Sequence, residues 1–205
     1  MPVSTLLALQ DLGFAWPGQP ALFNALSASF SPGLGLLSGD EQTGKTTLLR
    51  LLAGELLPDA GSLMLAGRPI GAGWAGFRPD MVRPELDPVP VGQWLREQVP
   101  EGLARDRLEE ALDGLSLAEH LPKTFHMLSA GGRRKVGLAA AMALLPPLIL
   151  LDQPFSALDL PSIRFVTAWL NKQSQASDRL VLVADYEATT ELQLTGRLQL
   201  GAADR

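Results

Sequence analysis

The sequence contains no cysteine, and it has only two histidines and one tyrosine in 205 residues. Without cysteine there are no disulfides, no thiol nucleophile and no zinc site built on thiolates, which fits a reducing compartment. Clustered basic residues are also missing, and the formal net charge is −5. Nucleic acid is therefore not an expected partner, because sequence-independent affinity for it depends on clustered Lys and Arg.

Long apolar runs are missing as well. The longest covers residues 138–151 and contains two prolines, whereas a helix that spans a bilayer needs about 20 apolar residues. The first residues lack the basic flank and apolar stretch of a signal peptide. We expect a soluble chain, so any membrane role must come through a partner. Its 46% hydrophobic and 19% charged residues, with this length, fit one domain with a small inserted lobe.

Alternation of apolar strands with helical segments predicts an α/β layered core. Strands are expected over residues 3–9, 22–30, 34–38, 60–65, 148–151 and 180–184, with a second hairpin strand near Arg68. Helices are expected over residues 45–57, 101–121, 131–145 and 162–175, and residues 192–200 are expected to form a terminal helix or a strand pair. A Pro- and Asp-rich composition change near residue 79 marks the start of a mostly helical lobe over 80–134.

The clearest chemical signal is a phosphate loop between an apolar strand and a helix. Gly39 to Thr46 read GDEQTGKT, which matches the G-x-x-x-x-G-K-[ST] pattern in full. The glycines let successive backbone N–H groups face phosphate oxygens, Lys45 can reach the β- and γ-phosphates, and the Thr46 hydroxyl can ligate Mg²⁺. The alternative is a glycine turn before an ordinary helix. The candidate nucleotide-binding residues here are Gly39, Asp40, Glu41, Gln42, Thr43, Gly44, Lys45, Thr46 and Thr47.

A second set of segments follows in a fixed order. Residues 148–152 (LILLD) place Asp152 at the end of a buried strand, where its carboxylate can hold the magnesium. Residues 128–132 (LSAGG) and the helix after them resemble the signature of ABC ATPases, residues 156–159 (SALD) resemble their D-loop, and Trp16 matches the aromatic residue that stacks on adenine. An isolated Trp16 could equally be a core or lid aromatic.

This resemblance covers nearly the whole chain and implies an ABC-type fold. That fold is a P-loop NTPase core with a mixed sheet, a small antiparallel β part and an inserted helical lobe, with residues 1–79 and 135–205 as the core and 80–134 as the lobe. It also implies that two nucleotide domains pair head to tail. Ser129, Gly131 and Gly132 of one would then cap the ATP-Mg²⁺ of the other; a plain helix N-cap at Ser129 is the alternative.

Several positions depart from the family pattern. Gln153 stands where a glutamate polarises the attacking water, and Asp185 stands where a histidine contacts the γ-phosphate. Arg78 replaces the Q-loop glutamine, and Gly132 stands where the signature ends in glutamine. Because an amide cannot accept a proton at neutral pH, we expect tight ATP binding and weak hydrolysis. An engineered Glu→Gln exchange would explain Gln153 but not Asp185 or Arg78.

The leading functional expectation is the ATP-binding subunit of an ABC transporter. It would act at the inner face of the cell membrane through a separate transmembrane permease, as a homodimer or as a heterodimer with a second nucleotide domain. The compact length and the LSAG form of the signature resemble small haem-exporter-type subunits. A soluble ABC-type regulator or assembly scaffold is the alternative, and a P-loop kinase would leave residues 128–132 and 156–159 as coincidences.

Overall fold

A computed structural model describes residues 5–71, 76–186 and 191–201, so the first two positions of the strand expected over 3–9 lie outside the described residues. The chain divides into two compact units. The first unit combines Met1–Arg78, Pro146–Gln153 and Leu170–Arg205, and the second combines Pro79–Leu145 with Pro154–Trp169. The lobe expected over 80–134 lies within the second unit, which extends further to residue 145 and includes part of a later helix.

An antiparallel sheet forms one layer of the first unit. It contains β1 (Leu7–Ala15), β2 (Ala21–Phe30), β4 (Ala60–Leu65) and β5 (Arg68–Pro69) in the order β2-β1-β4-β5. β1 runs six residues beyond the expected end at residue 9, with its register against β2 shifting between Leu9 and Leu12. Asp11 adopts a positive φ of 47° at this irregularity, which breaks the apolar alternation on which the sequence-based boundary rested.

A parallel sheet forms the second layer of this unit. Its strands are β3 (Gly33–Ser38), β6 (Leu148–Asp152), β7 (Leu180–Asp185) and β8 (Gly196–Gln199), in the order β6-β7-β3-β8. β3, β6 and β7 are buried along almost their full length, which explains why they are continuous apolar runs. Ser38 pairs with Asp185 and Asp152 with Ala184, so the ends of β3, β7 and β6 meet at one edge.

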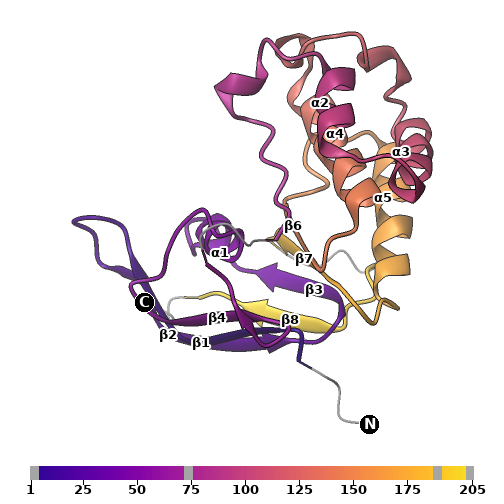
Figure 1. Cartoon of the computed structure of the whole chain (residues 1–205). Coiled ribbons are helices and arrows are strands. Elements are labelled where there is room, and N and C mark those ends of the chain that lie inside the picture. The colour runs from indigo at the N-terminus through magenta and orange to yellow at the C-terminus, as the bar shows by residue number, and fades with distance from the viewer. Residues whose placement is uncertain (1–4, 72–75, 187–190, 202–205) are drawn as a thin grey trace. The chain divides into compact units, whose positions relative to one another are not determined.

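Helix α1 (Lys45–Leu52) begins at this edge, directly after the phosphate loop. Figure 1 shows the place of α1 in this unit. The leucines of α1 share one hydrophobic cluster with residues of both sheets. The helix ends five residues before the expected residue 57, because Gly54 turns the chain at a φ of 68°. The α/β architecture expected from the sequence is thus confirmed for this unit.

The second unit is mainly helical. It contains α2 (Val91–Gln98), α3 (Leu103–Gly114), α4 (Ala130–Leu144) and the first ten residues of α5 (Leu160–Gln173). One short 3₁₀ turn precedes α2, and two lie between α3 and α4. α3 is shorter than the expected 101–121, since Ser116 takes a φ of 53° just after it. Arg107 on α3 donates from Nε to the carbonyl oxygen of Ala143 on α4 at 2.9 Å.

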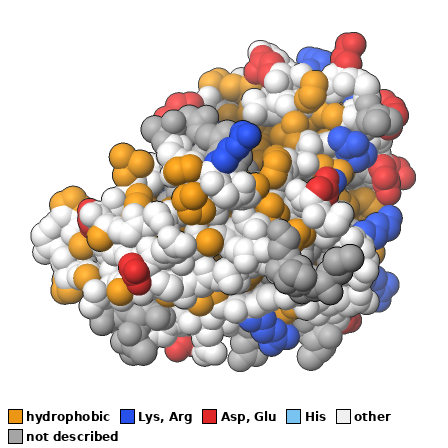
Figure 2. Space-filling view, turned by 60° about the horizontal axis from the view of Figure 1, so that its bottom comes forward, with side chains coloured by type: hydrophobic (Ala, Val, Ile, Leu, Met, Phe, Trp, Pro, Cys, Tyr) orange, Lys and Arg blue, Asp and Glu red, His pale blue; other side chains and the backbone are white. Residues whose placement is uncertain are grey.

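None of the helices in the described part of the chain is long and apolar enough to span a bilayer. On the face that Figure 2 presents, basic and acidic side chains are interspersed and hydrophobic side chains form small scattered groups.

Candidate nucleotide-binding site

The loop between β3 and α1 has a conformation that only glycine accommodates at its two ends. Gly39 has a φ of 152°, and a Cβ there would lie 2.6 Å from the carbonyl oxygen of Leu200. Gly44 has a φ of 95°, and a Cβ there would lie 2.8 Å from the ring of Phe23. Both the backbone angles and the space exclude side chains, as expected of a loop that curls around a phosphate group.

Lys45 is held back over this loop. Its side chain is buried, with the residue 7% exposed, and its Nζ donates to the carbonyl oxygens of Gly39 at 2.6 Å and Asp40 at 2.7 Å. The ammonium also lies 4.7 Å from the ring centroid of Tyr186, which is a cation–π contact. The loop therefore fixes one positive charge at the start of α1, where the helix end adds a positive partial charge.

Thr46 and Asp152 meet although 106 residues separate them. The Thr46 hydroxyl donates to Oδ2 of Asp152 at 2.7 Å. A hydroxyl and a carboxylate oxygen are hard ligands suited to Mg²⁺, which takes few protein ligands and completes its shell with phosphate and water. The residues present therefore fit a nucleotide-bound magnesium ion.

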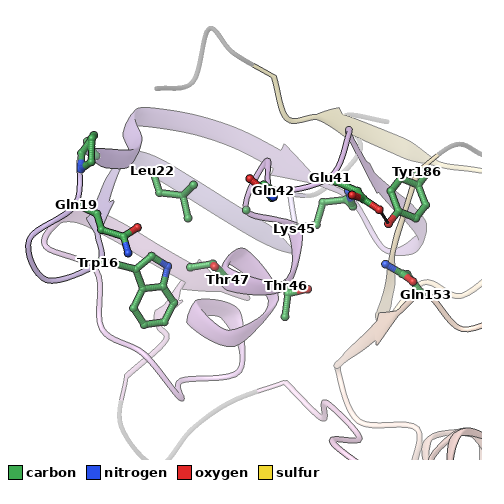
Figure 3. Close-up of a pocket in the computed structure, with 13 residues that line it drawn as sticks. Trp16, Gln19, Leu22, Glu41, Gln42, Lys45, Thr46, Thr47, Gln153 and Tyr186 are labelled. Atoms are coloured by element: carbon green, nitrogen blue, oxygen red, sulfur yellow. Dashed lines mark hydrogen bonds between the residues drawn. The ribbon is translucent and has the colours of Figure 1, made fainter. Parts of the chain in front are cut away.

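A cavity of about 650 Å³ opens over the phosphate loop, a size suited to a nucleotide. Figure 3 shows Trp16 at one end of it and Tyr186 at the other, with Lys45, Thr46 and Thr47 between them. All lining residues belong to the first unit: Trp16, Gln19, Pro20, Ala21, Leu22, Glu41, Gln42, Gly44, Lys45, Thr46, Thr47, Gln153 and Tyr186.

Trp16 contacts one residue of β1 and one residue of α1. Its ring packs edge-on against Phe14 with centroids 5.3 Å apart, and the Arg50 guanidinium lies 5.7 Å from its centroid. The structure places Trp16 in the cavity wall, where an aromatic face is available to a flat ligand.

Gln153 directly follows β6 and lines the cavity. Its backbone takes a φ of 45°, an uncommon conformation outside glycine, and its N–H donates to the carbonyl oxygen of Ala184 at 2.8 Å. Such left-handed residues cluster at functional sites, where surrounding structure holds them in place.

Tyr186 lines the cavity, whereas Asp185 is not among the described lining residues. Oδ1 of Asp185 accepts a hydrogen bond from the Tyr186 backbone N–H at 2.8 Å. The Tyr186 hydroxyl donates to Oε1 of Glu41 at 3.1 Å, and this bond is the main reason that the pKa of Tyr186 is raised. Sequence reasoning missed Tyr186, because a lone tyrosine after a strand belongs to no pattern. Its signal was adjacency to Asp185 at a strand end that meets the phosphate loop.

The signature segment lies in the second unit. Ser129 is the N-cap of α4, and its Oγ accepts from the Gly132 N–H at 3.1 Å. A Cβ on Gly131 would lie 2.2 Å from the carbonyl oxygen of Ala157, so this close approach requires glycine. Because no cavity-lining residue comes from this unit among the described residues, the expected role of Ser129, Gly131 and Gly132 toward a nucleotide stays a prediction.

Two further contacts fix the D-loop segment to α4 in the same unit. Lys135 donates from Nζ to Oδ2 of Asp159 at 2.5 Å, and Arg134 donates to the carbonyl oxygen of Ser156 at 2.8 Å. These contacts order residues 156–159 against the signature helix.

Arg78, which the sequence predicts at the Q-loop position, forms a two-pronged ion pair with Glu55. Its Nε and a terminal nitrogen donate to the two carboxylate oxygens of Glu55 at 2.8 Å and 2.9 Å. Glu55 also contacts Arg50 at 3.3 Å, and Arg50 is the residue that lies over Trp16. A chain of charges thus runs from Arg78 to the aromatic end of the cavity.

The combination of the phosphate loop, the contact between Thr46 and Asp152 and the two sheets defines a P-loop nucleotide-binding protein. Residues 23–156 match the family model described as ABC transporter. The chain belongs to the ABC transporter family, in which it corresponds to the ATP-binding subunits. Members of this family bind nucleotide and work with transmembrane permeases. The expectations of a bound nucleotide and of a transmembrane partner therefore hold at the level of the family.

Curated relatives give the degree of similarity. The chain is 30% identical over 190 residues to the cytochrome c biogenesis ATP-binding export protein CcmA of Pseudomonas aeruginosa, covering 88% of this chain and 94% of that protein. It is 33% identical over 174 residues to the cobalt import ATP-binding protein CbiO of Rhodobacter capsulatus, covering 77% of this chain and 62% of that protein.

Solved structures agree on the fold. An ATP-binding subunit of an ABC transporter superposes with a TM-score of 0.74 at 23% identity, covering 88% of this chain and 79% of the other. The ADP conformation of MJ1267, an ATP-binding cassette of an ABC transporter, gives 0.69 at 16% identity, with 91% and 83% covered. These likenesses confirm the predicted ABC ATPase fold class.

Proposed function

We propose that the chain binds ATP-Mg²⁺ in the cavity over its phosphate loop and uses that binding to drive a separate transmembrane subunit. The pairing of Thr46 with Asp152 at 2.7 Å carries this proposal, because it joins two magnesium ligands from distant parts of the sequence. Lys45 supplies the positive charge next to them. Bound Mg²⁺ would neutralise phosphate charge, with Thr46 and Asp152 as its protein ligands.

Hydrolysis is proposed to be slow. Gln153 lines the cavity at the position after Asp152, where its amide can orient a water molecule but cannot take its proton. Asp185 is a carboxylate and cannot donate a hydrogen bond to the γ-phosphate at neutral pH. General-base assistance is typically worth about 10²–10⁴ in rate, so the loss is of that order.

A second nucleotide domain would complete the site. The described residues that line the cavity belong to the first unit, and Ser129 is the N-cap of α4 in the second unit. A helix start with a serine and two glycines is suited to capping a terminal phosphate. The partner domain is either a second copy of this chain or a related domain with intact hydrolytic residues. Association with a transmembrane subunit would bring the chain to the membrane.

Calorimetric titration tests the nucleotide site. ATP is expected to bind only weakly without Mg²⁺ and tightly with it, and Lys45→Ala is expected to weaken binding by roughly 10- to 100-fold, the worth of charge-assisted hydrogen bonds. Thr46→Ala should remove most of the Mg²⁺ dependence, whereas Thr5→Ala, an exposed threonine outside the cavity lining, serves as control. Unchanged affinity in Lys45→Ala would overturn the proposal.

Phosphate release tests the hydrolytic part. Gln153→Glu is expected to raise turnover by about 10²-fold or more, as restored general-base assistance would. Gln98→Glu adds the same charge on the exposed end of α2 and should leave turnover unchanged. A wild-type rate equal to that of Gln153→Glu would show that the glutamine is no impairment. Co-purification with an integral membrane protein separates a transporter subunit from a soluble regulator.

A further inference from the structure

Four side chains meet at the Tyr186 end of the cavity. The Tyr186 ring lies over the Lys45 ammonium, and its hydroxyl donates to Glu41 at 3.1 Å, the bond drawn in Figure 3. The hydrogen bond to Glu41 raises the pKa of Tyr186, whereas the side chain of Gln153, which also lines the cavity, lowers it. The Tyr186 hydroxyl therefore keeps its proton and donates a hydrogen bond to a carboxylate that lines the same cavity.

The two ends of the cavity differ in chemistry. Trp16 at the far end offers an aromatic face, and Lys45 next to Tyr186 offers positive charge. A nucleotide with its base near Trp16 would therefore extend its phosphates toward Tyr186. In this orientation the γ-phosphate, which ADP lacks, is the phosphate nearest to Tyr186.

A glutamate at position 41 is unfavourable in a loop that binds phosphate, which suggests that Glu41 has a separate function. Its exposed carboxylate lines the same cavity, so its negative charge repels any phosphate that approaches Lys45. A γ-phosphate oxygen and the Glu41 carboxylate are both acceptors for the single O–H of Tyr186. Only one of them can hold it at a time.

We propose that Tyr186 is a specificity residue for the terminal phosphate: its hydroxyl donates a hydrogen bond to Glu41 in this structure and donates to a γ-phosphate oxygen instead when ATP binds. Glu41 is the competitor that sets how strongly the site prefers ATP to ADP. The inference rests on the proposed function, since it assigns residues to the phosphate end of the same site. In this inference Tyr186 donates the hydrogen bond to the γ-phosphate that the carboxylate of Asp185 cannot donate.

Two conservative substitutions should act in opposite directions. Tyr186→Phe keeps the ring over Lys45 and removes the hydroxyl, so affinity for ATP-Mg²⁺ should fall by about 3-fold or more while affinity for ADP-Mg²⁺ changes by less than 2-fold. Glu41→Gln removes the competing charge, so the ATP affinity should rise by about 3- to 10-fold. In the Glu41→Gln background, Tyr186→Phe should cost more ATP affinity than in the wild type, because the competitor is weaker.

The single tyrosine of the chain offers a direct readout. In protein labelled with ¹³C at tyrosine Cζ, one resonance reports on Tyr186, and a non-hydrolysable ATP analogue with Mg²⁺ should shift it while ADP-Mg²⁺ should not. Glu101→Gln, which removes an exposed carboxylate outside the cavity lining, is the control and should change neither affinity.

The inference is overturned when both substitutions change ATP and ADP affinity by the same factor, or when Glu41→Gln weakens ATP binding. Failure of the proposed function has a different signature, because the wild-type protein would then show no Mg²⁺-dependent ATP binding at all. Equal resonance shifts with the ATP analogue and ADP would also overturn the assignment of Tyr186 to the terminal phosphate.

Discussion

Gly39 and Gly67 are both glycines with positive φ, and they differ in what a side chain would meet. A Cβ on Gly39 would lie 2.6 Å from a backbone oxygen of β8's neighbour Leu200, which cannot rotate away. At Gly67, in the turn between β4 and β5, nothing lies within 4 Å. The first glycine is required by backbone angle and by space, and the second by angle alone.

Gly39→Ala should therefore lower the free energy of unfolding by about 2–4 kcal/mol, as the sum of a left-handed alanine and a clash with backbone. It should also abolish ATP binding, since the loop and Lys45 share hydrogen bonds. Gly67→Ala should cost about 1 kcal/mol and leave ATP affinity unchanged. Urea unfolding and calorimetry measure both quantities, and equal costs for the two variants would contradict the steric account.

At this scale the sequence alone was sufficient for residues whose type and spacing follow a pattern. Lys45, Thr46 and Asp152 were predicted from the phosphate loop and a buried strand, and the structure brings the last two into contact. Tyr186 could not be found in this way, because its position depends on β7 lying between β3 and β6. Strand order is set by packing of the whole sheet and is absent from any local window.

At the scale of elements, Asp159 joins the D-loop segment to two helices of the second unit. Its Oδ1 accepts from the Ser162 N–H at 2.9 Å as the N-cap of α5, and its Oδ2 accepts from Lys135 on α4. The hydrogen bond from Lys135, followed by those from Ser162, holds the pKa of Asp159 well below its ordinary value of 3.8. A carboxyl group whose pKa is lowered by folding stabilises the folded state at any pH above its ordinary pKa. This stabilisation is lost as the pH falls toward the lowered pKa.

Asp159→Asn should consequently lower the Tm at pH 7, and the gap from wild type should shrink as the pH falls below 4. The asparagine keeps a cap acceptor for Ser162, so Asp159→Ala should lower the Tm further. In the Lys135→Gln background the pH dependence of the gap should largely vanish. Thermal unfolding followed by circular dichroism at pH 7, 4 and 3 measures the gap, and a gap that widens on acidification would contradict the assigned ion pair.

Elements were predicted well where their periodicity is uninterrupted. β3, β6 and β7 lie where apolar runs placed them, within two residues at either end. Boundaries were wrong where one residue takes a left-handed conformation, as Asp11 does within β1 and Ser116 does after α3. α2 was not predicted as a separate helix, because it is short and lies between Pro90 and Pro100 in a proline-rich segment.

At the scale of the whole molecule, the two units are expected to respond differently to nucleotide. The described residues that line the cavity belong to the first unit. ATP-Mg²⁺ at 100 times its Kd should stabilise the state that binds it by about 2.7 kcal/mol. The signature residues lie in the second unit, and in the proposed pairing they contact the nucleotide of a partner domain. Protein concentration therefore separates binding from pairing.

Hydrogen exchange measured by mass spectrometry resolves these two steps. In dilute protein, ATP-Mg²⁺ should slow exchange in the phosphate loop and α1 and leave α3 and residues 129–132 unchanged. With rising protein concentration, residues 129–132 should become protected as a second domain caps the γ-phosphate, and Lys45→Ala should abolish both effects. The Gln153→Glu variant, by turning ATP over, should shorten the lifetime of the concentration-dependent protection and leave that of the first step unchanged. Protection of residues 129–132 that does not depend on protein concentration would exclude capping by a partner domain.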